Sequence, residues 1–182
     1  NLNKIFRENA AWSTLSTNAL AMRYTPPGTL FESKGSACFT KNHRDLMGVL
    51  GFGNSNLVNE FLLALSPTLD YHEGPVSRLP YLSKVSDAQL GVIECALGHA
   101  KADWDNFETS WDFCDLPLLR PGDWEVEPGQ PGGPWKGRTL AESWDHYATY
   151  CNAAIRRMQE LETENNRLWI DAYGLQDELD PA

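Results

Sequence analysis

Closely spaced cysteines, long apolar runs and a secretory leader are all missing from this chain of 182 residues. The four cysteines lie far apart, and none is at ligand spacing from a histidine. This pattern argues against a zinc site and fits a reduced, cytoplasmic protein. The longest apolar run, residues 61–65, is far too short to span a membrane. No basic segment precedes an apolar one at the start, so no signal peptide is predicted.

The motifs that mark common catalytic sites are also missing. There is no Walker loop, H-E-x-x-H, G-x-S-x-G or EF-hand pattern. Residues 50–53, Leu-Gly-Phe-Gly, look like part of a glycine-rich loop. They fall between two predicted helices, so we expect a turn that lets those helices pack. The acidic residues between 103 and 112 are expected on a solvated helix face. We therefore assign no catalytic, cofactor-binding or metal-binding residue.

The charge is unevenly distributed along the chain, whose net charge is -10. Residues 1–84 hold eight Lys or Arg against six Asp or Glu, whereas residues 85–182 hold seven against nineteen. Such asymmetry indicates a division of labour between the two halves. Only the first half could face a polyanion without strong repulsion.

Two long helices are predicted in the acidic half. Ser86 with Gln89, and Thr139 with Glu142, form capping boxes that open helices over about 86–113 and 139–173. Gly174 is typical of the residue that follows a helix. Apolar residues recur at steps of three and four in both helices, which predicts a coiled-coil-like antiparallel pair. We expect Trp104, Trp111 and Trp144 to fill its seam, with Asn165 as a polar residue that fixes register. The seam positions are Leu90, Ile93, Leu97, Ala100, Trp104, Phe107 and Trp111 in the first helix, and Leu140, Trp144, Tyr147, Cys151, Ala154, Met158, Leu161, Asn165, Leu168 and Ala172 in the second. The Pro/Gly-rich residues 117–138 between the helices predict a long loop.

Residues 1–84 are predicted to form short strands and two short helices. Strands are predicted at 19–24, 29–32, 36–40 and 68–72, and helices at about 44–50 and 55–65. The predicted fold is therefore α+β: a small mixed or antiparallel sheet with short helices in residues 1–84, followed by the helix pair in residues 85–182. The chain begins with Asn1 rather than Met and closes on a short acidic segment after a long helix, so we expect an excerpt of a larger polypeptide.

Several segments, taken in order, carry a resemblance to a known family. They are residues 11–16 (Ala-Trp-Ser-Thr-Leu-Ser), 23–24, 35–39, 50–55 (Leu-Gly-Phe-Gly-Asn-Ser), 65–74, 76–80, 101–113 and 164–179. In this order they resemble the C-terminal part of large adenine-specific DNA methyltransferases. The best match is the PglX type of BREX phage-defence systems, and related type II restriction-modification methylases are close behind. The Pro/Gly loop is the part that does not match.

The resemblance implies that residues 1–84 form part of a target-recognition domain and that the helices form a spacer. It also implies that the catalytic domain, with its S-adenosylmethionine loop and Asn-Pro-Pro-Tyr/Phe motif, lies elsewhere in the same polypeptide. Neither motif occurs here, so no catalytic role is carried over. Double-stranded DNA and other defence-system subunits are the implied partners. The candidate DNA-binding residues carry polar or basic side chains that can contact phosphates or base edges. They are Ser13, Ser16, Arg23, Lys34, Ser36, Lys41, Asn42 and Arg44, with the 13–18 turn and the 41–44 loop as their setting.

Two other hypotheses remain open from the sequence. The acidic helices are poorly suited to DNA and could instead dock partner subunits without any DNA contact. A self-contained enzyme has the least support, because no nucleophile–base arrangement can be nominated. For each candidate residue, an ordinary surface role is an equally good interpretation.

Overall fold

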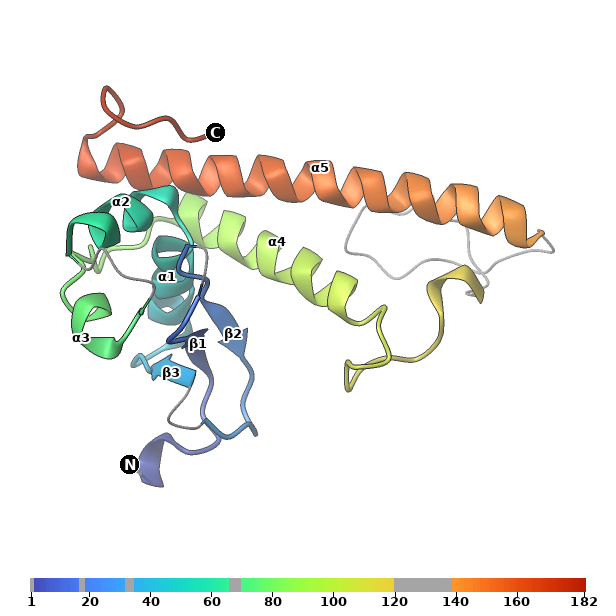
Figure 1. Cartoon of the computed structure of the whole chain (residues 1–182), viewed down its shortest axis with the longest axis horizontal. Coiled ribbons are helices and arrows are strands. Elements are labelled where there is room, and N and C mark those ends of the chain that lie inside the picture. The colour runs from blue at the N-terminus through green and yellow to red at the C-terminus, as the bar shows by residue number, and fades with distance from the viewer. Residues whose placement is uncertain (1, 17–18, 32–34, 66–69, 120–138) are drawn as a thin grey trace. The chain divides into compact units, whose positions relative to one another are not determined.

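The computed structural model describes residues 2–16, 19–31, 35–65, 70–119 and 139–182 (Figure 1). The chain divides into two compact units. The sheet-bearing unit contains Asn1–Ile93 and Thr163–Ala182, and the helical unit contains Glu94–Glu162. The boundaries of these compact units differ from the boundary expected at residue 84, because residues 163–182 pack with residues 1–93. The division of function between residues 1–84 and 85–182 stays a prediction.

The sheet has three antiparallel strands in the order β2-β1-β3. The central strand β1 (Asn9–Ser13) pairs with β2 (Arg23–Thr25) and with β3 (Gly35–Cys38). A 3₁₀ turn, η1 (Leu2–Lys4), precedes it. The predicted α+β class with a small sheet is confirmed. However, β1 was not predicted, and residues 29–31 are not a strand. Of the expected strand at 68–72, the described residues show one isolated bridge, between Asp70 and Leu15.

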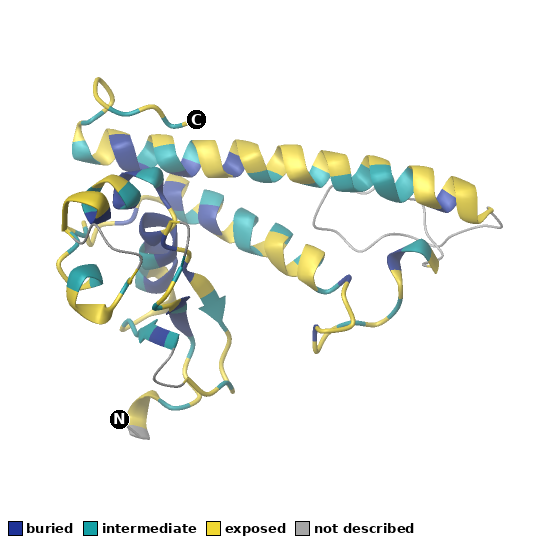
Figure 2. Ribbon diagram, viewed as in Figure 1, coloured by how far each residue is buried: buried dark blue, intermediate teal, exposed yellow. Residues whose placement is uncertain are grey.

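Helix α1 (His43–Gly53) contributes four buried apolar side chains to the core of the sheet-bearing unit, those of Leu46, Met47, Leu50 and Phe52. It packs against β1 and against α2 (Asn56–Leu65), and α3 (Glu73–Val76) follows (Figures 1 and 2). The expectation of a turn at 50–53 was wrong, because Gly51 and Gly53 belong to the last turn of α1. Gly51 nevertheless serves close packing. A Cβ there would lie under 3.0 Å from the Ile93 side chain, so only glycine lets α1 approach this closely.

The end of α5 (Leu140–Tyr173) joins the sheet-bearing unit through two asparagines. Asn165 donates from Nδ2 to the Gly51 carbonyl at 2.8 Å, and Asn166 accepts from the Asn56 N–H at 3.0 Å. The Gly51 carbonyl lies at the end of α1 and the Asn56 N–H at the start of α2. Backbone groups at such helix ends have no hydrogen-bond partner within the helix. Asn165 therefore completes a helix end, a role different from the expected fixing of register. Trp169 is fully buried beside Phe52, with ring centroids 5.2 Å apart.

The predicted starts of both long helices and the predicted end of α5 are confirmed in detail. Ser86 and Gln89 exchange capping-box hydrogen bonds at the start of α4 (Asp87–Trp104), and Thr139 and Glu142 do the same for α5. Gly174 has φ +68°, and Leu175 N–H bonds the Ile170 carbonyl, which is the Schellman arrangement. None of the helices in the described part of the chain combines the length and apolarity that crossing a membrane requires.

The helical unit departs most from expectation. Helix α4 ends at Trp104, nine residues before the predicted end, and a turn follows it. Lys101, near the end of α4, bridges Asp105 at 2.5 Å and Asp112 at 2.6 Å in the segment that follows the helix. The three tryptophans expected in a buried seam are exposed: Trp104 by 54%, Trp111 by 88% and Trp144 by 59%. Of the predicted seam residues, Ile93, Leu161 and Asn165 are buried. The helical unit also includes η2 (Pro117–Leu119), and most of the expected Pro/Gly loop lies outside the described residues.

Candidate nucleic-acid interface

The strand register separates the predicted DNA-binding residues into two groups. Asn9 pairs with Thr25, and Ala10 pairs with Cys38, so the start of β1 lies beside the ends of β2 and β3. The segment that carries Lys41, the N-cap Asn42 and Arg44 in the first turn of α1 therefore begins at this end of the sheet. Ser13 pairs with Gly35 at the opposite end, and Ser16 follows it along the chain. The predicted residues that the structure describes thus do not form one continuous cluster.

Three of the predicted residues are engaged in holding the fold. Ser36 is 4% exposed, and its hydroxyl donates to Glu73 Oε1 at 2.7 Å. Asn42 is the N-cap of α1; its Oδ1 accepts from the Asp45 N–H at 2.8 Å. Arg44 donates to the Val85 carbonyl at 2.7 Å and to Asp87 Oδ1 at 2.6 Å. These contacts give Ser36, Asn42 and Arg44 structural roles that account for their polarity without DNA.

The remaining predicted residues lie at the surface or outside the described residues. Ser13, Arg23 and Lys41 are exposed, and Ser16 is half-buried. Lys34 lies outside the described residues. The assignment of DNA contacts to these positions stays a prediction, and the geometry leaves Arg23 and Lys41 as the exposed cations among them.

Two cations that the sequence analysis did not single out lie beside Lys41. Arg7 donates from Nη2 to the Thr40 carbonyl at 3.0 Å, and Lys4 places its Nζ 5.3 Å from the centroid of the Phe39 ring. Both contacts join the segment before β1 to the loop after β3. We call Lys4, Arg7 and Lys41 the basic end of the sheet. The sequence analysis did not predict β1 as a strand. It therefore gave no indication that Lys4 and Arg7 lie near Lys41.

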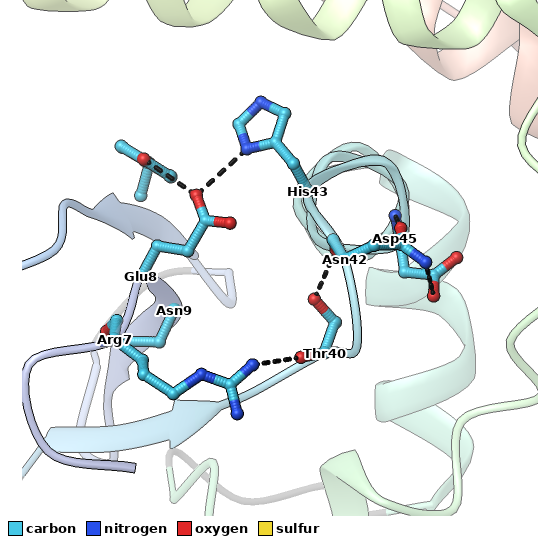
Figure 3. A network of polar contacts seen from close by, with 8 residues as sticks. Arg7, Glu8, Asn9, Thr40, Asn42, His43 and Asp45 are labelled. Carbon is cyan, nitrogen blue, oxygen red and sulfur yellow. Dashed lines mark hydrogen bonds and ion pairs between the residues drawn. The ribbon is translucent and has the colours of Figure 1, made fainter. Parts of the chain in front are cut away.

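A small network of polar contacts holds the carboxylate of Glu8, the residue next to Arg7 (Figure 3). Glu8 Oε2 accepts from the Tyr24 hydroxyl at 3.0 Å and lies 3.0 Å from His43 Nδ1. The contact with His43 is the main cause that holds the pKa of Glu8 below its ordinary value. Burial, followed by the bond to Glu8, raises the pKa of Tyr24. In Figure 3 Glu8 turns toward His43, whereas Arg7 reaches toward Thr40. The carboxylate is thus directed away from the arginine.

The chemistry offered by this surface is that of binding. Among the described residues, no group of three His, Cys, Asp or Glu side chains is placed to hold a metal ion. The cysteines Cys38, Cys95, Cys114 and Cys151 are free thiols, and burial raises the pKa of Cys38. An exposed guanidinium and two ammonium groups on an ordered strand end suit an anionic partner.

Comparison with known proteins identifies what the chain is similar to. It is 35% identical over 176 residues to an adenine-specific methyltransferase PglX of Lacticaseibacillus casei (strain Zhang), which covers 97% of this chain. It is 31% identical over 165 residues to an adenine-specific methyltransferase BrxX of Escherichia coli O9:H4 (strain HS), which covers 88%. The predicted resemblance to PglX-type adenine-specific methyltransferases is confirmed. The chain spans only 14% and 12% of these two relatives. No protein-family model matches it.

Proposed function

We propose that this chain is a DNA target-recognition segment of an adenine-specific DNA methyltransferase in a phage-defence or restriction-modification system. The observation that carries the proposal is the 35% identity to a PglX-type adenine-specific methyltransferase across 97% of the chain. An enzyme that modifies one base in a sequence context needs protein surfaces that grip phosphates and read base edges. The sheet-bearing unit, with its exposed Arg23 and its basic end, supports assignment of that task to this segment.

The proposal assigns binding to this segment and methyl transfer to another part of the same polypeptide. S-adenosylmethionine is the proposed methyl donor, and it would bind outside these 182 residues. The residues proposed to contact DNA are Ser13, Ser16, Arg23, Lys34 and Lys41, to which the geometry adds Lys4 and Arg7. Ser36, Asn42 and Arg44 would contribute indirectly, because they hold β3, α1 and α4 in place.

An exchange of segments tests target recognition directly. The matching segment of the Lacticaseibacillus casei relative is replaced by this chain, and methylated adenines are mapped across a host genome. If the segment reads DNA, the chimaera should modify a different sequence from the parent enzyme. Continued modification of the parent's own sequence would contradict the proposal.

A second arm covers the case in which the chimaera is inactive. The 182-residue chain is titrated with a fluorescently labelled duplex at low salt, and binding is followed by anisotropy. Binding that Arg23→Gln weakens is expected. Arg44 is a poor choice for this test, because its bonds to Val85 and Asp87 make its loss a change in stability.

A second function, docking of partner subunits, is favoured by one feature of the helical unit. Trp104, Phe107 and Trp111 are each more than half exposed on the turn that Lys101 holds. Exposed tryptophans are enriched among the residues that dominate protein interfaces. In the chimaera, Trp111→Ser should leave the methylated sequence unchanged and reduce co-purification with the parent system's other subunits. A changed methylated sequence would instead assign this turn to DNA recognition.

A further inference from the structure

The three cations of the basic end come from two segments more than thirty residues apart. Lys4 and Arg7 precede β1, and Lys41 follows β3. Pairing of β1 with β3 brings these segments together, and the Arg7–Thr40 bond and the Lys4–Phe39 contact fasten them. All three side chains are exposed. The positive charge is therefore gathered by tertiary structure at one end of the sheet.

The chain has a net charge of -10, and part of its positive charge is paired with carboxylates. Arg44, Lys101, Arg157 and Arg167 form such ion pairs, whereas Arg23, Arg78, Lys84 and Arg156 form none within the part of the chain that the structure describes. In the described ranges, no carboxylate lies within ion-pair distance of Lys4, Arg7 or Lys41.

Two acidic residues close in sequence to these cations have other partners. Glu8 is held by Tyr24 and His43, and Asp45 accepts from the Asn42 side chain at 2.9 Å. The basic end is therefore left available to an external anion.

The partial fixing of these side chains favours phosphate over a base edge. Arg7 uses one of its five N–H donors on Thr40 and keeps the others for a partner, in the planar geometry that suits two phosphate oxygens. Because the side chain is already anchored, less conformational entropy is lost when it binds. Lysine ammonium groups act as point charges that suit phosphate oxygens without reading sequence.

We propose that Lys4, Arg7 and Lys41 form a sequence-independent phosphate anchor, which grips the backbone of duplex DNA at the end of the sheet opposite Ser13 and Ser16. This inference rests on the proposed function and adds a division of labour to it. The anchor sets affinity and orientation, and the other exposed residues are left to discriminate between sequences.

The salt dependence of duplex binding by the 182-residue chain tests the anchor. Counterion release makes the logarithm of the binding constant fall linearly with the logarithm of salt concentration, with a slope of about -0.9 for each neutralised phosphate. The variant R7Q/K41Q should therefore have a slope shallower by about 2, and its affinity at about 100 mM salt should fall at least about tenfold. K4Q alone should change the slope by about 1. The loss should be equal for duplexes of different sequence.

The matched control is R78Q/R156Q, which removes the same charge from two exposed arginines outside the basic end. Its slope should equal that of the unmodified chain. Equal losses in the two double variants, or an unchanged slope in R7Q/K41Q, would overturn the anchor and leave DNA binding intact. Tighter binding of duplex RNA than of duplex DNA would overturn the choice of partner. Absence of any duplex binding by the unmodified chain would instead contradict the proposed function. Circular dichroism of each variant verifies that it is folded.

Discussion

Replacing Gly48 by alanine tests whether α1 is packed as closely as the structure indicates. Gly48 lies in the middle of α1 and is buried. An added Cβ would come well under 3.0 Å from Val85 Cγ2 and from the Tyr81 hydroxyl oxygen. Val85 is 8% exposed and β-branched, so it has little freedom to move away.

Two opposing effects set the expected magnitude. Overpacking a buried site costs about 1–3 kcal/mol, and alanine is preferred over glycine in a helix by about 1 kcal/mol. Because the side chains of both Val85 and Tyr81 would have to shift, the steric cost should lie near or above the upper end. We expect G48A to lose about 2 kcal/mol of unfolding free energy, which lowers the melting temperature by roughly 4–8 °C.

Gly91 provides a control with the opposite sign. It lies in α4 within the same unit, is exposed, and would have nothing within 4 Å of an added Cβ. G91A should therefore gain about 0.5–1 kcal/mol from helix propensity alone. Urea and thermal unfolding followed by circular dichroism measure both variants. Equal stability of G48A and G91A would refute the close packing around α1.

Three further outcomes are expected. N165A should lose about 1–3 kcal/mol of unfolding free energy, because the Gly51 carbonyl is then buried without its donor. The control N152A, on the exposed surface of the same helix, should change urea unfolding little. The stability of E8Q should fall less in acid than the stability of the original chain. The pKa of Glu8 is lowered in the folded state, so the ionised carboxylate adds to the free energy of unfolding above pH 4.5. This stabilisation is lost as the pH falls below 4.5 and through the folded pKa. Unfolding of E8Q and of the original chain at a series of pH values would reveal the difference. Y81F should be at least as stable as the original, because the Tyr81 hydroxyl is buried without a hydrogen-bond partner. Burial is the main cause that raises the pKa of Tyr81 to about 12. The stability that depends on the neutral phenol is therefore fully present below pH 10.0 and is lost as the pH rises from 10.0 through about 12. The absorbance change near pH 12 should be absent from Y81F.

Local features of the fold could be predicted from the sequence because their causes are local. The capping boxes at Ser86 and Thr139 and the C-terminal Gly174 depend on residues within one helical turn. Strand β1 was missed because Asn-Ala-Ala-Trp-Ser has no β-branched residue. Its strand conformation depends on pairing with β2 and β3, which sequence propensity does not report.

The predicted helix pair illustrates a different limit. The apolar spacing continues through Trp111, yet α4 stops at Trp104. There Ser110 donates to Asp105 Oδ1 at 2.7 Å and accepts from the Asp112 N–H at 3.1 Å. Side chains that bond locally in this way compete with helix formation. The apolar spacing is present in the sequence, but the burial of Trp104, Trp111 and Trp144 inferred from it was wrong.

The candidate interface could be predicted only in part. Arg23 and Lys41 were identified by residue type and are exposed. Ser36 has the same polar character but is buried against Glu73, a contact between residues 37 positions apart that the sequence does not reveal. Lys4 and Arg7 join Lys41 only through the β1–β3 pairing. Long-range contacts, more than residue chemistry, decide which polar groups remain available to a ligand.

Site-specific photocrosslinking tests the central claim most directly. A benzophenone-bearing amino acid replaces exposed Asn3, beside the basic end, or exposed Trp111 in the helical unit, and each chain is irradiated with a labelled duplex. We predict a DNA adduct from position 3 that unlabelled duplex competes away, and none from position 111. An adduct from position 111 without one from position 3 would contradict the assignment of DNA contact to the sheet-bearing unit.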